Sequence, residues 1–243
     1  MSKLPKITLY FWIMKICATT LGETAGDLLS MTLNIGYALS SLMLIGFFVM
    51  TLGAQLASRK HHPWLYWAVI LSTSTAGTTM SDYMDRTLGL GYIKGTIILL
   101  ILLVAILAFW RVSVRDLSVV NINTLKVELL YWTTILFSNT LGTALGDFLA
   151  DTSGLGFGGG ALLISSLIGL VVIAHGYSRM SKVLLFWVAF VLTRPFGATM
   201  GDWLTKPHGK GGLGLGTVGA SAILAAILGV FVLHSKRPQT KVG

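Results

Sequence analysis

The sequence is poor in charge. Asp, Glu, Lys and Arg make up only 11% of its 243 residues, whereas hydrophobic types make up 54%. Soluble domains usually carry about 25% charged residues, and a globule of this size could not bury so much apolar sequence. Disordered chains are rich in charge and poor in apolar residues, and the single Cys17 excludes a disulfide scaffold within the chain. These absences leave a polytopic membrane protein.

Long stretches contain no charged residue at all. All 31 residues between Asp27 and Arg59 are uncharged, and so are all 27 between Asp151 and Arg179. A helix needs roughly 20 residues to cross the hydrocarbon core of a bilayer. The pattern predicts an all-α fold, with one membrane domain over 1–243 and eight spans. The spans are expected at 8–29, 36–57, 64–83, 93–110, 128–149, 157–177, 182–203 and 216–234.

The basic residues are distributed unequally between the two sides that these spans define. One side has twelve: Lys3, Lys6, Arg59, Lys60, Arg111, Arg115, Lys126, Arg179, Lys182, Lys236, Arg237 and Lys241. The other has four: Arg86, Lys94, Lys206 and Lys210. Because cytoplasmic loops carry the excess of Lys and Arg, both termini are expected in the cytoplasm. The formal charge of +9 is thus explained by topology, and no nucleic-acid partner is expected. The first span lacks a small-residue cleavage site and is not expected to be a removed signal peptide.

Four segments align without gaps, starting at Phe11, Tyr66, Tyr131 and Phe186. They share an aromatic residue, a Trp, nine further residues and then G-x-x-x-[GS]-D. The Trp set is Trp12, Trp67, Trp132 and Trp187, and the Asp set is Asp27, Asp82, Asp147 and Asp202. A weaker element with Gly36, Gly91, Gly156 and Gly216 opens the even-numbered spans.

The repeat units cover about 8–60, 63–115, 126–180 and 182–236, in halves of about 1–118 and 119–243. Each unit holds two spans, so all four units point the same way and form parallel repeats. We expect a bundle of four two-helix hairpins with approximate twofold or fourfold symmetry. The four Asp residues are expected at one depth, in the outer part of the bilayer.

These W-x9-G-x-x-x-[GS]-D units resemble a family of bacterial inner-membrane proteins known as a tandem repeat of unknown function, with four copies per chain. The resemblance implies a multi-pass protein of the bacterial inner membrane and conveys no activity. The first unit departs from the shared pattern by adding Glu23, the second has Ser81 for the second Gly, and the fourth has Arg194-Pro195.

The small residues of the motif are spaced for close helix packing. They lie four residues apart in each unit: Gly22 and Gly26, Gly77 and Ser81, Gly142 and Gly146, Gly197 and Gly201. Small residues at this spacing allow membrane helices to approach each other closely. We expect these glycines to have a packing role.

The acidic residues are the main candidates for function. Seven of the nine Asp and Glu residues are motif Asp residues or lie within four residues of one. A charge within a membrane helix costs about 2.5–3.5 kcal/mol on insertion scales, so such a concentration suggests a binding site. The alternative is that each Asp is a polar helix end that caps the following turn.

Hydroxyl groups share a helix face with each Asp, at positions three and seven residues before it. They belong to Thr20, Thr24, Thr75, Thr79, Thr140 and Thr199. Together with the carboxylates and Glu23, they would give an oxygen-lined path, which suits hard divalent cations. The alternative for each hydroxyl is a local bond to the carbonyl four residues earlier. Soft-metal chemistry is not favoured, because Cys17 is alone and no paired His lies within a span.

Two cations fall inside spans. Arg194 is expected to pair with Glu23 or a neighbouring Asp, and the alternative is an exchanging counter-charge that releases carboxylates when substrate binds. Such a pair would leave about four uncompensated negative charges. Lys15 is expected to extend toward the inner interface. The four Trp residues are interpreted as an interfacial aromatic belt, with a cation–π gate as the alternative.

The leading hypothesis is a transporter of a cation, such as Mn²⁺, bound by the motif Asp residues. Its partners would be the lipid bilayer and a small cationic substrate; no other cofactor is expected, and a homo-oligomer stays open. The alternatives are a carrier of a small organic cation or neutral solute, and a membrane scaffold or sensor without transport. An enzyme is not expected, because the sequence has neither G-x-S-x-G nor H-E-x-x-H.

Overall fold

The computed structural model describes residue 5 and residues 7–58, 60–119, 122 and 124–235, and this part of the chain is helical without strands. The long helices are α1 (Leu9–Asp27), α2 (Tyr37–Ala57), α3 (Pro63–Asp82), α4 (Gly91–Val114), α5 (Leu125–Asp147), α6 (Gly156–Tyr177), α7 (Lys182–Thr205) and α8 (Gly216–Ser235). Both ends of each helix lie within four residues of the corresponding ends of a predicted span. Six of the basic residues counted above, Lys3, Lys6, Arg59, Lys236, Arg237 and Lys241, lie outside the described residues.

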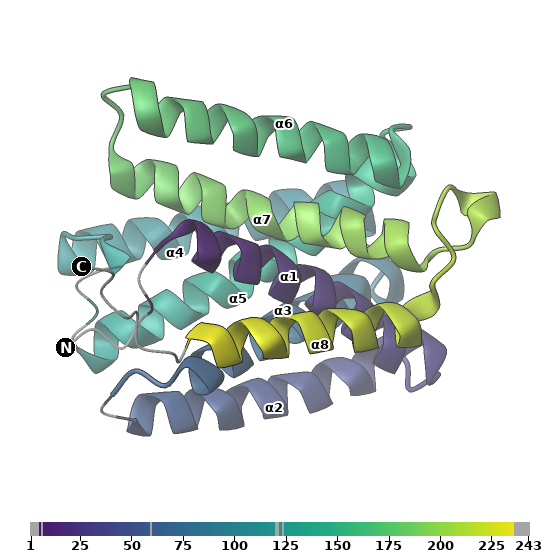
Figure 1. Ribbon diagram of the computed structural model, residues 1–243, viewed down its shortest axis with the longest axis horizontal. Coiled ribbons are helices and arrows are strands. Elements are labelled where there is room, and N and C mark those ends of the chain that lie inside the picture. The colour runs from purple at the N-terminus through teal and green to yellow at the C-terminus, as the bar shows by residue number, and fades with distance from the viewer. Residues whose placement is uncertain (1–4, 6, 59, 120–121, 123, 236–243) are drawn as a thin grey trace.

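The four Trp-led helices form the inside of the bundle. Helices α1, α3, α5 and α7 pack in a closed ring, each against two neighbours. The outer helices surround this ring, with α2 against α3, α4 against α5, α6 against α7 and α8 against α1 (Figure 1). Each outer helix therefore packs mainly on the inner helix of the following repeat, unlike the self-contained hairpins that we expected. The repeats interlock, and α8 closes the circle on α1.

The bundle buries many polar side chains beside its apolar core, and its outside is apolar, unlike that of a soluble protein. Buried residues of the inner helices include Thr19, Ser74 and Thr143, whereas Leu42 and Leu162 of the outer helices are 68% and 69% exposed. Five helices, α2, α4, α6, α7 and α8, are long and apolar enough to cross a membrane, as in a multi-pass membrane protein. Helices α1, α3 and α5 have 19, 20 and 23 residues, about 28–35 Å. They carry more polar residues because neighbouring helices cover much of their surface.

The link from inner to outer helix repeats in detail. A π-helical turn starts directly after the motif Asp in the first three repeats: η1 (Leu28–Thr32), η2 (Tyr83–Thr87) and η4 (Phe148–Thr152). The weaker glycine element follows and opens the outer helices as expected, since Gly36, Gly91, Gly156 and Gly216 all have φ between +66° and +82°. Only glycine adopts this backbone region without strain. In the fourth repeat, a loop with the 3-10 turn η5 (His208–Lys210) replaces the π-helical turn.

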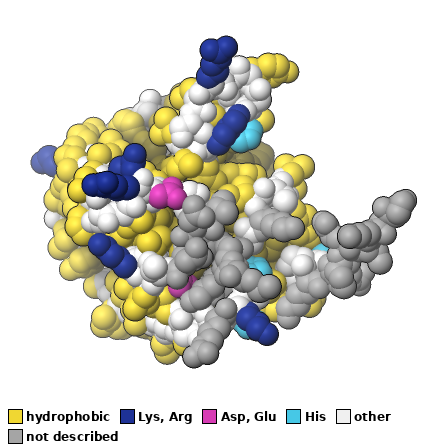
Figure 2. Space-filling view, turned by 90° about the vertical axis from the view of Figure 1, so that its left-hand side faces the viewer, with side chains coloured by type: hydrophobic (Ala, Val, Ile, Leu, Met, Phe, Trp, Pro, Cys, Tyr) yellow, Lys and Arg dark blue, Asp and Glu magenta, His cyan; other side chains and the backbone are white. Residues whose placement is uncertain are grey.

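The inner helices start, and the outer helices finish, at one end of the bundle. Lys and Arg side chains lie around this end, with few acidic ones among them, while hydrophobic side chains cover the flanks (Figure 2). The loops and helix ends here contain Lys60, Arg111, Arg115, Lys126 and Arg179. This is the end for which the positive-inside rule predicts the cytoplasm.

The motif glycines mark where adjacent inner helices touch. A Cβ added at Gly22, Gly77, Gly142 or Gly197 would lie within 3.0 Å of an atom of the next helix in the ring. At Gly77, two of the atoms met are backbone, the Thr140 nitrogen at 2.9 Å and the Asn139 carbonyl carbon at 3.0 Å. Backbone atoms cannot rotate away, so helices α3 and α5 depend on glycine here.

Replacing Gly77 by Ala should therefore force α3 and α5 apart. We expect Gly77→Ala to lower the free energy of unfolding by about 1–3 kcal/mol, the usual cost of overpacking. Denaturant titration in detergent micelles measures this. Gly46→Ala is the matched control, because Gly46 lies exposed in α2 with nothing within 4 Å of the added Cβ. Equal stability of the two variants would contradict the assigned packing role.

Candidate functional site

Each inner helix directs a stripe of residues four apart toward the ring axis. On α1 the stripe consists of Lys15, Thr19, Glu23 and Asp27, all at most 4% exposed. The corresponding stripes on α3, α5 and α7 end at Asp82, Asp147 and Asp202. The ring thus contains successive layers of polar side chains that lead to a layer of four carboxylates.

Arg194 connects all four inner helices. It is fully buried in α7, and its Nη1 lies 2.9 Å from Glu23 Oε2 of α1. Its Nη2 donates to Thr78 Oγ1 of α3 at 2.5 Å and to Thr143 Oγ1 of α5 at 2.6 Å. Nη2 also donates to the Ser74 carbonyl at 3.3 Å. The guanidinium therefore occupies the ring interior next to the Asp layer, on the side where the inner helices start.

Glu23 is the acceptor at the centre of this network. Its Oε2 also accepts hydrogen bonds from Thr78 Oγ1 at 3.2 Å and from Thr143 Oγ1 at 3.4 Å. A buried ion pair is tolerated only when further hydrogen bonds satisfy both charges, because desolvation of each ion costs several kcal/mol. The geometry confirms the expected pairing of Arg194 with Glu23. Both roles considered for Arg194, a structural ion pair and an exchanging counter-charge, include this pairing.

The four motif Asp residues are held in two pairs, each bridged by one cation. Lys206 Nζ lies 3.2 Å from Asp27 Oδ2 and 3.0 Å from Asp202 Oδ1, which joins α1 to α7. In the second pair, Arg86 joins α3 to α5: its Nε lies 3.0 Å from Asp82 Oδ1 and its Nη2 lies 3.3 Å from Asp147 Oδ2. Both cations stand four residues after the Asp of their own repeat.

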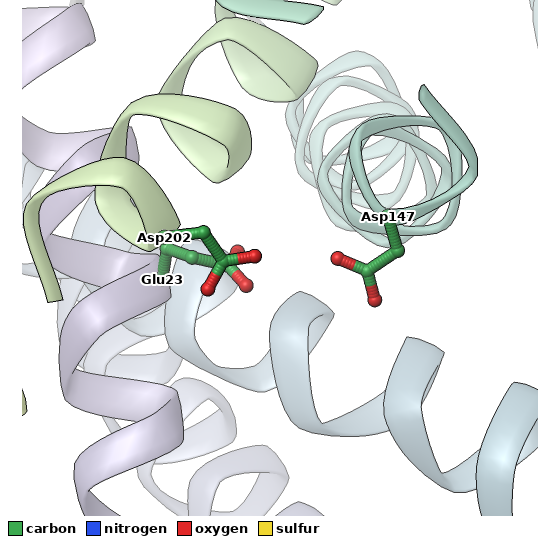
Figure 3. Close-up of side chains that lie close together, drawn as sticks. All are labelled: Glu23, Asp147 and Asp202. Atoms are coloured by element: carbon green, nitrogen blue, oxygen red, sulfur yellow. The ribbon is translucent and has the colours of Figure 1, made fainter. Parts of the chain in front are cut away.

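Three carboxylates from three inner helices lie close together. Single oxygens of Glu23, Asp147 and Asp202 all lie within 4.8 Å of one another, and all three residues are buried. Asp147 points from one side toward the other two (Figure 3). We call these three residues the carboxylate triad. Such a spacing allows one cation to contact all three.

The charge of the site differs from our expectation of about four uncompensated negative charges. The structure adds Arg86 and Lys206 to Arg194, so three cations face the five carboxylates of Glu23 and the motif Asp residues. With every group ionised, two negative charges remain. The span pattern alone predicts loop positions for both added cations, where they would contribute only to topology.

Two cations and one acid near the site lie outside the long helices. Burial acts to lower the pKa of Arg86 and of Lys206, but the two carboxylates beside each raise it more, so the pKa of both ends above its ordinary value. Both side chains are therefore charged at neutral pH. Burial raises the pKa of Asp85 to about 6; Ser81 donates to its carboxylate, and Gly95 of α4 leaves the room that it fills.

The predicted hydroxyl stripe has a different role from the layers on the axis. Thr20, Thr75, Thr79, Thr140 and Thr199 each donate to the carbonyl four residues earlier in their own helix, and Thr24 donates to Leu21. The local-bonding alternative therefore describes these hydroxyls. Thr78 and Thr143, which the sequence analysis did not select, supply the central hydroxyls instead.

Lys15 and the Trp set also lie deeper than expected. Lys15 is fully buried and does not reach the interface: its Nζ lies 4.2 Å from the Phe190 ring centroid and 3.5 Å from Asn139 Oδ1. Of the four Trp residues, Trp67, Trp132 and Trp187 are at most 4% exposed and Trp12 is partly buried. They pack in an aromatic layer of the core, where neighbouring helices cover them.

Two sequence signals could have identified the missed residues. Arg86 and Lys206 both stand four residues after a motif Asp, and both occur in even-numbered repeats. Thr78 and Thr143 stand where the first repeat has Glu23, directly after the first motif glycine. Aligning the repeats by every column, rather than by the shared columns alone, would have placed these residues beside the carboxylates.

The fold and site define a helical bundle of four interlocked repeats, with membrane-compatible outer helices and a buried cluster of acids inside. The family model of the Repeat of Unknown Function (DUF347) matches the chain four times, at residues 10–61, 65–116, 130–181 and 185–240. The chain therefore belongs to this family, which confirms the resemblance of its motifs. No curated protein and no solved structure matches it.

Removing Arg194 should leave Glu23 as an uncompensated buried charge. We expect Arg194→Met to destabilise the fold by about 3–5 kcal/mol, as for other buried pairs that lose one partner. The double variant with Glu23→Gln should recover much of this loss, because no unpaired charge remains. Denaturant titration of the parent, the two single variants and the double variant measures the coupling. If Arg194→Met is as stable as the parent, Arg194 does not hold the four helices together.

Proposed function

We propose that this chain is a cation transporter of the bacterial inner membrane, with eight spans and both termini in the cytoplasm. The proposed substrate is a divalent metal ion such as Mn²⁺, bound by the carboxylate triad. The apolar outer helices and the basic loops at one end of the bundle support the membrane topology.

The carboxylate triad is the observation that carries the proposal. Its three residues come from α1, α5 and α7, and their oxygens lie within 4.8 Å of one another. Buried acids in a membrane bundle are costly and are typical of ion pathways. Asp82 supports the same conclusion: it is 1% exposed, and its Oδ2 has no hydrogen-bond partner among the described residues.

The chemistry of the site favours a hard divalent ion. All candidate ligands are carboxylate or hydroxyl oxygens, which suit Mg²⁺, Mn²⁺ and Ca²⁺ better than soft metals. With every group ionised, the two negative charges that remain after Arg194, Arg86 and Lys206 balance the charge of one such ion. Binding would therefore leave the interior of the ring neutral.

Arg194 indicates a carrier in preference to an open channel. Its guanidinium contacts α1, α3 and α5 within the ring, directly below the carboxylates. An ion could pass this level only after Arg194 moved. The arrangement corresponds to a state closed on the side of the basic loops, and transport would require a second arrangement of the inner helices.

The position of Arg194 across the ring interior also favours one other function, a sensor that binds the cation without transporting it. In that case Arg194 would stay in place and the bound ion would change only the packing of the inner helices. Binding and uptake measured on the same variants distinguish the two functions.

Neutralising the triad should abolish binding. We expect Mn²⁺ to raise the melting temperature of the purified parent, and Asp147→Asn and Asp202→Asn to lose this rise, since each removes a charged ligand. Asp116→Asn, at an exposed loop position, is the matched control and should keep it. Uptake of Mn²⁺ into proteoliposomes should likewise be lost in Asp147→Asn and Asp202→Asn and kept in Asp116→Asn. Triad variants that behave like the parent would exclude the site, and binding without uptake would identify the sensor.

The topology has a separate test. In a Cys17→Ser background, a cysteine introduced at the exposed Gly209 should react with a membrane-impermeant maleimide added outside intact cells. A cysteine at the exposed Arg179 should react only after the cells are opened. The opposite pattern would reverse the orientation, and reaction at both sites in intact cells would rule out the eight-span topology.

A further inference from the structure

The two bridging cations occupy equivalent places in the ring. Arg86 belongs to the second repeat and Lys206 to the fourth, and each contacts the Asp of its own repeat and the Asp of the next one. Arg86 thereby ties α3 to α5, and Lys206 ties α7 to α1. The recurrence after two repeats indicates a twofold device in which each cation connects two inner helices.

Both cations lie on the solvent side of the carboxylates. Their side chains are 30% and 21% exposed, whereas the side chains of the four Asp residues are only 2–6% exposed. An ion that approaches from this end of the bundle meets Arg86 and Lys206 before it meets the carboxylate triad. Each cation also neutralises one triad member, since Arg86 contacts Asp147 and Lys206 contacts Asp202.

The two cations are not held equally firmly. Arg86 donates from Nη1 to the Tyr37 hydroxyl at 3.2 Å, and its Cζ lies 5.8 Å from the ring centroids of both Tyr37 and Tyr92. Lys206 is anchored by its two carboxylates at the end of α7, where the fourth repeat has its longer loop. An ammonium on a flexible stem is also easier to withdraw than a guanidinium packed between aromatic rings.

We propose that Lys206 is a displaceable counter-cation: it holds Asp202 while the triad is empty, and it gives up Asp202 but keeps Asp27 when a divalent cation enters. Arg86 is its fixed counterpart. Together they set the charge that the site accepts: with both present, two negative charges remain, which one divalent ion neutralises and one monovalent ion does not. This inference rests on the proposed function, because it assumes that the triad binds a cation.

The prediction is a gain of affinity. Removing the charge of Lys206 eliminates a competitor for Asp202, so Lys206→Met should bind Mn²⁺ at least about tenfold more tightly than the parent, the effect of one close charge. Lys206→Arg should bind like the parent. Lys210→Met removes the same charge from an exposed position in the same loop and should leave the affinity unchanged. The variant Lys206→Met should also lose discrimination, so that K⁺ competes with Mn²⁺ more strongly than in the parent.

Isothermal titration of Mn²⁺ into the purified full-length protein, with and without K⁺, measures these affinities. If Lys206 has a purely structural role, Lys206→Met will bind Mn²⁺ more weakly than the parent or equally well. Provided that the parent binds Mn²⁺, either result overturns this inference and leaves the proposed function standing. A parent that binds no Mn²⁺ overturns the proposed function and the inference together. If Lys206→Met does not fold, Lys206→Gln serves for the same comparison.

Discussion

The buried pair between Arg194 and Glu23 is the interaction on which the interior of this protein depends. One guanidinium, fully buried, reaches the other three inner helices through Glu23, Thr78 and Thr143. The charges of such a pair are expensive to desolvate, so the pair needs further hydrogen bonds to both of its partners. That network fixes how each inner helix is rotated about its own axis, and the rotation decides which side chains of the next layer converge.

The layer above the pair follows from this rotation. Because Glu23 faces the axis, Asp27 one turn later faces it too, and the repeat brings the other three motif Asp residues to the same level. Four carboxylates so close together would repel one another strongly, and Arg86 and Lys206 reduce this repulsion by bridging them two by two. Stability and the proposed function therefore use the same groups, since the cations that hold the ring closed also neutralise the ligands.

Much of the fold could be predicted because its signals are local or repeated. The uncharged runs located the helices, and the glycine element marked the start of each outer helix. The packing partner of each outer helix could not be predicted, since a hairpin and an interlocked ring have the same span pattern. For the site, Thr24 and Glu23 stand three and four residues before Asp27. Both lie near the helix face that carries Asp27, about 100° apart around the helix. Contacts with neighbouring helices choose Glu23, and the sequence of one helix does not contain that information.

The central claim is that the carboxylate triad binds a divalent cation. The most direct test is to determine the structure of the protein with Mn²⁺ and to locate the metal by its anomalous scattering. The account predicts one strong peak among Glu23, Asp147 and Asp202, with Lys206 withdrawn from Asp202. The account would be contradicted if, at a Mn²⁺ concentration that saturates uptake, no peak appeared at the triad and its present ion pairs were unchanged.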